Sequence, residues 1–216
     1  MYYQIKGLVL NSCTCGEADK IATIYSYEWG KIQAVVPSAK KITAKLAAAT
    51  EPLTESEFMV FQSHSSMRPK ITGASIIKNN SAVKTNFNKN IHALYAAEIG
   101  DKFTPFNMEN TEKYELISRV WELFADCRYP KRILTAFVLR FLKLSGYSLS
   151  DYIKNNISAA DKLTESAVIK FSRCSGGDAD NISDFDDYRI WNYVENYLIN
   201  YIKRPSVSVF MRKINF

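Results

Sequence analysis

The sequence predicts an α+β protein in which an N-terminal OB-type β-barrel is followed by an all-α helical domain. Two observations lead to this prediction. Up to about residue 80, short runs of β-branched and aromatic residues alternate with turn residues. Beyond that point, apolar residues recur with the helical period of about 3.6 residues. We therefore expect an OB-fold domain over residues 1–80 and a helical domain over residues 81–216.

Five short strands are expected in the first domain. Turn residues at 16–19 separate the first two strands, and Gly30 supplies the positive φ that the next tight turn requires. The alanine-rich piece at 44–49 is expected to form the single helical turn that such barrels often carry. The expected strands contain or cover residues 8–10, 21–27, 32–36, 57–62 and 70–78.

Four helices are expected in the second domain. Pro105, Pro130 and Pro205 follow three of the apolar periodic segments and end them, and Gly146 is the expected stop of the remaining one. The third helix is apolar over a wide face, which is typical of a helix at the centre of a bundle. The expected helices cover residues 87–103, 110–129, 131–144 and 185–203.

The net charge of +6 and the isoelectric point of about 9.0 favour an acidic partner such as nucleic acid. Aromatic residues make up 13% of the chain, and they can serve either the core or a stacking surface. No apolar run approaches the length of a membrane span, and no secretory leader opens the chain. The four cysteines show no disulfide framework, so we expect a cytoplasmic protein with no membrane partner.

Residues for catalysis or metal binding are scarce. The sequence has two histidines and lacks a phosphate loop, a nucleophile elbow and a HExxH motif, which predicts that the protein is not an enzyme and needs no cofactor. His92 is expected to be a helix-surface or hydrogen-bonded residue. Cys13 and Cys15 are expected to pack rather than to ligate a metal. The acid-rich loop at 177–187 lacks the EF-hand register, so we interpret it as a solvated loop that caps the last helix.

Two basic groups are candidate binding surfaces. The first lies on loops that border one face of the predicted barrel, where cations would contact phosphates and aromatic rings would stack on bases. The alternative is an ordinary solvated loop. The predicted nucleic-acid-binding residues are Lys31, Lys40, Lys41, Lys45, Arg68 and Lys70.

The second basic group lies on the predicted third helix, where cations flank a strongly apolar face. Such a surface suits an acidic peptide with an aromatic end, because carboxylates pair with arginine while the ring is buried. The alternative is a buried helix whose cations extend to solvent. The predicted partner-binding residues are Lys131, Arg132, Phe137, Arg140, Phe141 and Lys143.

The ordered series KGLVL, GEADKIATIYS and GKIQAVVPSAKK resembles the N-terminal domain of the bacterial RecO family, and AKLAAATEPLTESEF and RFLKLSGYSL continue the likeness. The resemblance implies a nucleoid-associated mediator of DNA repair and recombination. It would bind single- and double-stranded DNA, anneal strands and help to load recombinase, with RecR and the tail of single-stranded DNA-binding protein as partners. Many relatives carry a four-cysteine zinc site after the segment matching Gly146, where this chain has only Cys174, so we expect no metal. The alternative function is a basic OB-fold protein-interaction module with weak nucleic-acid binding.

Overall fold

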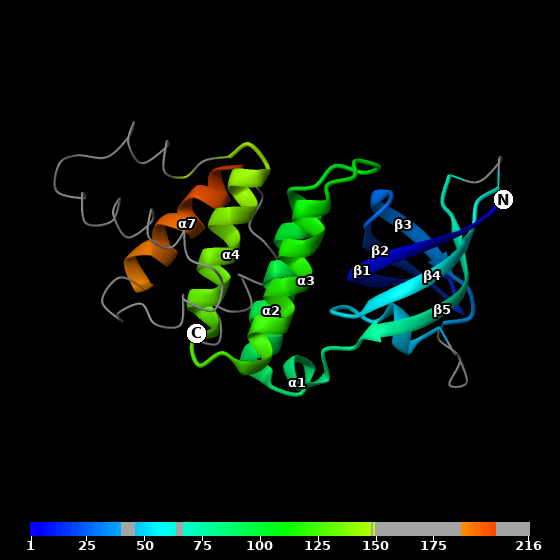
Figure 1. Cartoon of the computed structure of the whole chain (residues 1–216), viewed down its shortest axis with the longest axis horizontal. Helices are drawn as coiled ribbons and strands as arrows, with labels where there is room; N and C mark the ends of the chain where they lie inside the picture. Colours follow the sequence, from blue (N-terminus) through cyan, green and yellow to red (C-terminus); the bar gives the residue numbers. More distant parts are fainter. Residues whose placement is uncertain (40–45, 64–66, 148, 150–186, 202–216) are drawn as a thin grey trace.

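The computed structural model describes residues 1–39, 46–63, 67–147, 149 and 187–201. Strands come first and helices follow, as predicted (Figure 1). The strands are β1 (Tyr2–Cys15), β2 (Asp19–Ser26), β3 (Gly30–Val36), β4 (Glu55–Phe61) and β5 (Lys70–Lys78). The helices are η1 (Ala48–Thr50), α1 (Ser81–Lys84), α2 (Phe87–Lys102), α3 (Thr111–Asp126), α4 (Pro130–Leu144) and α7 (Asp187–Tyr201).

The five strands close into a barrel in the order β1-β2-β3-β5-β4. Neighbours are antiparallel except β3 and β5, which run parallel and are joined by the pair Val35 and Lys70. A closed five-stranded barrel with this crossover has the architecture of the OB fold. The predicted fold class is therefore confirmed. The 3-10 turn η1 lies before β4, slightly later than the helical turn predicted at 44–49, of which residues 44 and 45 lie outside the described residues.

The barrel interior is filled by alternate residues of the strands, because successive side chains of a strand point to opposite faces. The described residues of the interior are aliphatic, apart from one phenylalanine. The buried members are Ile5, Val9, Ala22, Ile24, Ile32, Ala34, Val36, Ala39, Phe58, Val60 and Ile71. This core gives the barrel a rigid wall on which surface side chains are held in place.

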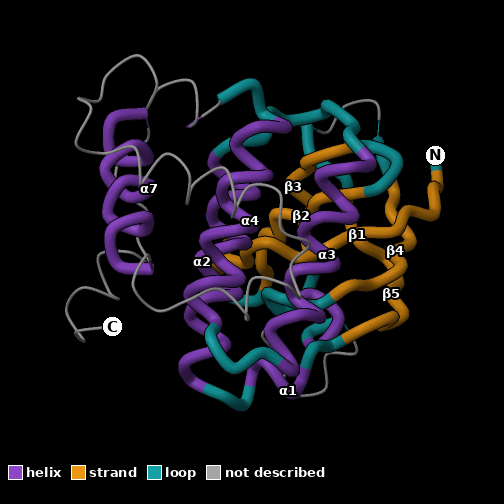
Figure 2. Tube along the Cα trace, turned by 60° about the vertical axis from the view of Figure 1, so that its left-hand side comes forward, coloured by secondary structure: helices purple, strands orange, loops and turns teal. Residues whose placement is uncertain are grey.

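The helices stack in layers against one side of the barrel (Figures 1 and 2). Helices α2 and α3 lie nearest the strands, α4 packs on both of them, and α7 packs on α4 at the far side. A second apolar core runs through these layers and includes Leu8, Leu10, Tyr25 and Leu53 from the barrel's outer wall. The two halves therefore share a continuous apolar contact.

The predicted signals at Asn110 and Gly146 mark helix ends in the structure. Asn110 caps α3 by accepting the amide of Lys113 at 2.9 Å, and Pro130 occupies the first turn of α4. Gly146 follows α4 with a φ of +82°, as a helix stop requires. The first strand is longer than the predicted apolar triplet, and the four-residue α1 was not predicted. None of the described helices is both long enough and apolar enough to cross a bilayer.

Candidate nucleic-acid and partner interfaces

The segment that follows α2 is clamped onto the barrel at the turn into β3. Phe106 forms a parallel bridge with Lys31, and the amide of Asn107 donates to the Lys31 carbonyl oxygen over 2.9 Å. Gly30 permits this approach, because its φ is +66° and a Cβ there would lie 2.0 Å from the carbonyl oxygen of Met108. The helical half therefore supplies part of the barrel's surface at this point (Figure 1).

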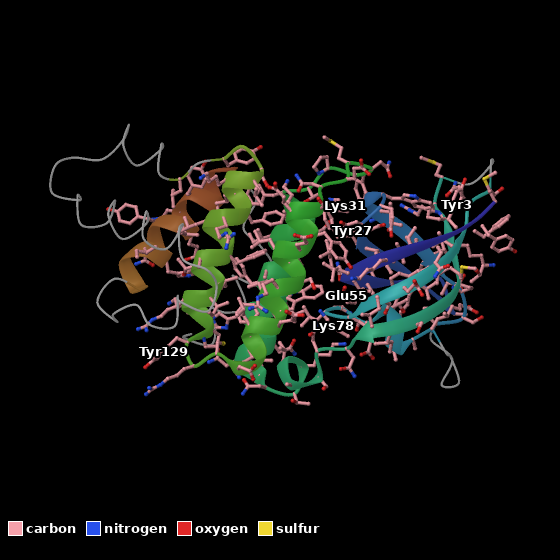
Figure 3. All side chains as sticks on the ribbon, in the orientation of Figure 1. Tyr3, Tyr27, Lys31, Glu55, Lys78 and Tyr129 are labelled. Carbon is pink, nitrogen blue, oxygen red and sulfur yellow. The ribbon has the colours of Figure 1, made fainter. Side chains whose placement is uncertain are left out.

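Lys31 is a structural cation of this clamp. Its side chain is 7% exposed, and its ammonium donates to the Asp101 carbonyl oxygen at 2.6 Å and lies 3.2 Å from the Asp101 carboxylate. The same ammonium lies 4.3 Å from the centre of the Phe106 ring, within the range of a cation–π contact. Figure 3 shows Lys31 between the barrel and the helices. Because its ammonium is already paired with Asp101 and Phe106, Lys31 is not part of the proposed phosphate-binding surface.

The other predicted nucleic-acid-binding residues divide into two sets. Arg68 and Lys70 are exposed and lie at the start of β5, and the Arg68 Nε donates to the side-chain oxygen of Gln33 on β3 over 3.2 Å. The structure therefore brings these two cations together beside β3. The remaining predicted residues, Lys40, Lys41 and Lys45, lie outside the described residues.

A pocket opens beside β3, next to Arg68. We call it the seam pocket, because it lies along the seam where β3 meets β5. Its volume is about 510 Å³, within the range of small-ligand sites. Its lining combines two aromatic rings, a methionine, three amide side chains and one cation. The lining residues are Trp29, Ile32, Gln33, Gln62, Met67, Arg68, Pro69, Phe106 and Asn107.

A buried carboxylate joins the barrel to α3 (Figure 3). Glu55 on β4 lies 2.9 Å from the Lys6 ammonium and 3.7 Å from that of Lys78, and it accepts hydrogen bonds from Tyr114 at 3.1 Å and Ser118 at 3.0 Å. Burial raises the pKa of Glu55, but the hydrogen bonds from Lys6 and Ser118 and the charges of Lys6 and Lys78 outweigh it, so the pKa lies below its ordinary value. Burial, reinforced by Glu55, raises the pKa of Tyr114. This network keeps Glu55 ionised and holds the two halves in register.

The predicted partner-binding residues of α4 differ in exposure. Arg132 is 3% exposed, and its guanidinium lies 4.1 Å from the centre of the Tyr129 ring. Phe141 is fully buried, and the Lys113 ammonium lies 5.2 Å from the centre of its ring. The structure therefore does not present Arg132 and Phe141 to a partner. Lys131 is half-buried and Lys143 is exposed.

Phe137 and Arg140 line a small groove between α3 and α4. The groove is apolar apart from one arginine on each helix, Arg119 and Arg140, both exposed. Arg119 pairs with Glu122 on its own helix at 3.1 Å. The remaining lining residues are apolar: Leu116, Val120, Leu123, Ile133, Ala136 and Phe137. We call this the α3–α4 groove.

Comparison with known proteins shows which proteins the chain is similar to. Residues 1–80 match the family described as "Recombination protein O N terminal". A protein of Heliobacterium modesticaldum named DNA repair protein RecO is 29% identical over 146 residues, which are 67% of this chain and 52% of that protein. The protein of the same name from Acetivibrio thermocellus is 26% identical over 181 residues, 80% of this chain and 68% of that protein. The chain is thus similar to proteins named DNA repair protein RecO.

The predicted resemblance to RecO is thereby confirmed. The Listeria monocytogenes protein of that name is 28% identical over 141 residues, 65% of this chain and 54% of that protein. The matched part spans between about half and two thirds of the length of these RecO relatives.

Sequence reasoning missed two parts of these interfaces. Arg119 lies on a different helix from Arg140, and nothing near it in the sequence distinguishes it from an ordinary surface residue. Phe106 and Asn107 lie in a turn segment far along the chain from β3, so no local pattern connects them to the barrel. One signal was available for Trp29, which precedes the predicted turn glycine in an aromatic-rich strand region.

The histidine and the two cysteines that the sequence analysis considered for catalysis or metal binding differ in burial. His92 is buried with its Nδ1 2.8 Å from the Asn88 carbonyl oxygen, and burial lowers its pKa. Cys13 and Cys15 are exposed, so the expectation that they pack is wrong. Among the described residues, no three histidine, cysteine or acidic side chains form a group suited to a metal ion. Cys174, His64 and the loop at 177–187 lie outside the described residues.

The four-cysteine zinc site of many RecO relatives does not fit this sequence. After Gly146 the chain has one cysteine, Cys174, and no histidine, whereas a structural zinc ion takes four ligands from cysteine or histidine. Metal-free folding therefore stays a prediction.

Proposed function

We propose that this protein is a DNA repair and recombination mediator. It binds single- and double-stranded DNA through the barrel, anneals complementary strands, and helps to load recombinase onto DNA coated with single-stranded DNA-binding protein, with RecR as a partner. The observation that carries the proposal is the closed OB barrel whose sequence matches the RecO N-terminal family. The mechanism is binding and handover without a covalent step, at the nucleoid. In this proposal residues 1–80 bind DNA and residues 81–216 bind proteins.

The charges on the barrel support DNA binding. Arg68 and Lys70 are exposed side by side at the start of β5, and the protein as a whole carries a charge of +6. Cations in such positions release counterions from phosphates, and this contribution to binding is independent of sequence. We propose that Lys40, Lys41 and Lys45 extend the same surface. A strand-annealing assay tests the function directly, since the protein should accelerate pairing of complementary strands that are coated with single-stranded DNA-binding protein.

Replacing Lys40 and Lys41 together by alanine should weaken DNA binding equally for all sequences. Each lost phosphate contact should lower the slope of log affinity against log salt by roughly 0.7–0.9. Fluorescence anisotropy with labelled DNA over a salt series measures both quantities. The matched control is the Lys102→Ala/Arg128→Ala variant, which removes the same charge from exposed positions of the helical half. An equal change in the control would mean that net charge, and not this surface, governs binding.

We also propose that the α3–α4 groove binds the acidic, phenylalanine-ended tail of single-stranded DNA-binding protein. Its apolar lining suits a phenyl ring, and Arg119 and Arg140 stand at its edges to pair with carboxylates. The present volume of the groove is about 30 Å³, so a ring enters only as the lining side chains move apart. Arg140 replaces the buried Arg132 as the principal carboxylate partner in this proposal.

Arg140→Glu should weaken binding of the tail peptide about tenfold, because an attractive charge at the groove's edge becomes repulsive. Arg119→Glu should have a similar effect. Anisotropy of a labelled peptide measures the affinity, and Lys102→Glu is the control with the same change in net charge. DNA binding should stay within about twofold of wild type in all three variants. Equal peptide affinity across the variants would place the tail elsewhere on the protein.

A further inference from the structure

We propose that the seam pocket holds one unpaired nucleobase of a bound strand. The inference rests on the proposed DNA binding and adds to it the form of DNA that the barrel selects. The pocket lies between Arg68 on the barrel and Phe106 on the clamped segment, so both halves of the chain build it. A nucleic-acid strand that follows the exposed cations at the start of β5 would pass the mouth of the seam pocket.

The lining of the pocket suits a flat aromatic ring. Ile32 and Pro69 are buried apolar members of the lining, while Trp29 and the exposed Phe106 supply aromatic rings. Stacking of a base on an aromatic side chain is a main source of affinity for single strands, and it tolerates every base. The volume of about 510 Å³ leaves room for a base with its sugar.

The polar lining suits the edge of a base. Gln33, Gln62 and Asn107 each carry an amide group, which both donates and accepts hydrogen bonds. Their presence favours a neutral ligand with mixed donors and acceptors, such as the pairing edge of a base. None of the described residues that line the pocket is a carboxylate, so none of them repels the phosphate that accompanies the base.

The two rings are held in place before any ligand arrives. The Lys31 ammonium lies 4.3 Å from the centre of the Phe106 ring, and the Tyr3 ring packs edge-on against Trp29 with 5.0 Å between centroids. Rings that are fixed in advance lose little side-chain freedom on binding. The Arg68 side chain is directed by its hydrogen bond to Gln33, which brings a cation to the mouth. These contacts explain why the clamp buries a lysine that sequence reasoning assigned to phosphate.

An unpaired base is favoured over a base within a duplex. In a duplex the pairing edge is occupied and the ring faces are stacked, so a base must first be flipped out at a cost of a few kcal/mol. The pocket therefore discriminates in favour of single strands, whereas the exposed cations contact the phosphates of either form. An acidic peptide is disfavoured, because Arg68 is the one cation among the described lining residues and the amides do not neutralise charge.

The test compares wild type with Phe106→Ala on three labelled ligands: an oligothymidylate, an abasic strand with the same backbone, and a duplex of equal length. Loss of one stacked base should weaken oligothymidylate binding about tenfold, within the range for a single base–aromatic contact. Binding of the abasic strand and of the duplex should change less than twofold. Phe87→Ala is the control, since it removes another exposed phenylalanine at the start of α2.

Tryptophan fluorescence gives a second readout. Trp121 and Trp191 are buried, while Trp29 lines the pocket, so oligothymidylate should quench wild-type fluorescence and quench Trp29→Phe much less. If wild type binds oligothymidylate and Phe106→Ala binds it equally well, the pocket assignment is overturned while the proposed function stands. Equal losses for all three ligands would also overturn it. If wild type binds no DNA, the proposed function itself fails.

Discussion

Replacing Gly30 by alanine is expected to lower the free energy of unfolding by about 3 kcal/mol or more. Two costs add at this position. The φ of +66° disfavours an L-residue by roughly 1–2 kcal/mol, and the new Cβ would lie 2.0 Å from the Met108 carbonyl oxygen. Backbone atoms cannot yield as a flexible side chain does, so the clamped segment must move off the barrel. Urea unfolding of wild type and variant measures the loss.

Gly16→Ala separates these two costs. Gly16 has nearly the same φ, +63°, but a Cβ there would meet nothing within 4 Å. It should therefore lose only the backbone contribution of roughly 1–2 kcal/mol. The Gly30 variant should in addition lose affinity for oligothymidylate, because Phe106 and Asn107 leave the seam pocket. Equal losses of stability in the two glycine variants would show that the clamp contributes no stability.

Gly30 both forms a tight turn and allows a close approach of Met108, and only the first of these roles can be predicted from the sequence. The Trp29–Gly30 pair, set between two β-rich runs, predicts a tight turn that needs a positive φ, and the structure has it. The approach of Met108 involves a residue in the other half of the chain, and no local pattern encodes it. The same contrast between local signals and long-range contacts applies to helices and strands. Strands and helices with clear period and turn residues were predicted, since those signals act over a few residues.

Side-chain roles proved harder to predict than elements. A lysine on a turn is ordinarily solvated, and only the tertiary approach of Asp101 and Phe106 makes Lys31 a buried structural residue. Arg132 was predicted to face a partner because it flanks an apolar helix, but it stacks on Tyr129 at the start of that helix. Composition and helical period place a residue on an element, whereas its partners depend on which elements meet.

Glu55→Gln is expected to lower the free energy of unfolding by about 2 kcal/mol at neutral pH. The change keeps the shape of the side chain but removes a carboxylate that is 3% exposed and accepts hydrogen bonds from Tyr114 and Ser118. Hydrogen bonds to a charged group contribute roughly 1.5–3 kcal/mol. The two lysines that pair with Glu55 are nearly half exposed, which screens their share. Urea unfolding at several pH values measures the difference between the two proteins.

The pH dependence of the stability difference between wild type and Glu55→Gln shows whether the carboxylate charge causes it. The pKa of Glu55 in the folded protein lies below its ordinary value of 4.5, so its stabilising effect is complete above that value and is lost as the pH falls through the folded-state pKa. The gap between wild type and Glu55→Gln should therefore be constant from neutral pH down to about pH 5 and should close in acid. Glu57→Gln is the matched control, because it removes the same charge from an exposed position on the same strand, and it should change stability by less than about 0.5 kcal/mol. A gap that persists unchanged in acid would mean that packing around Glu55, and not its charge, joins the barrel to α3.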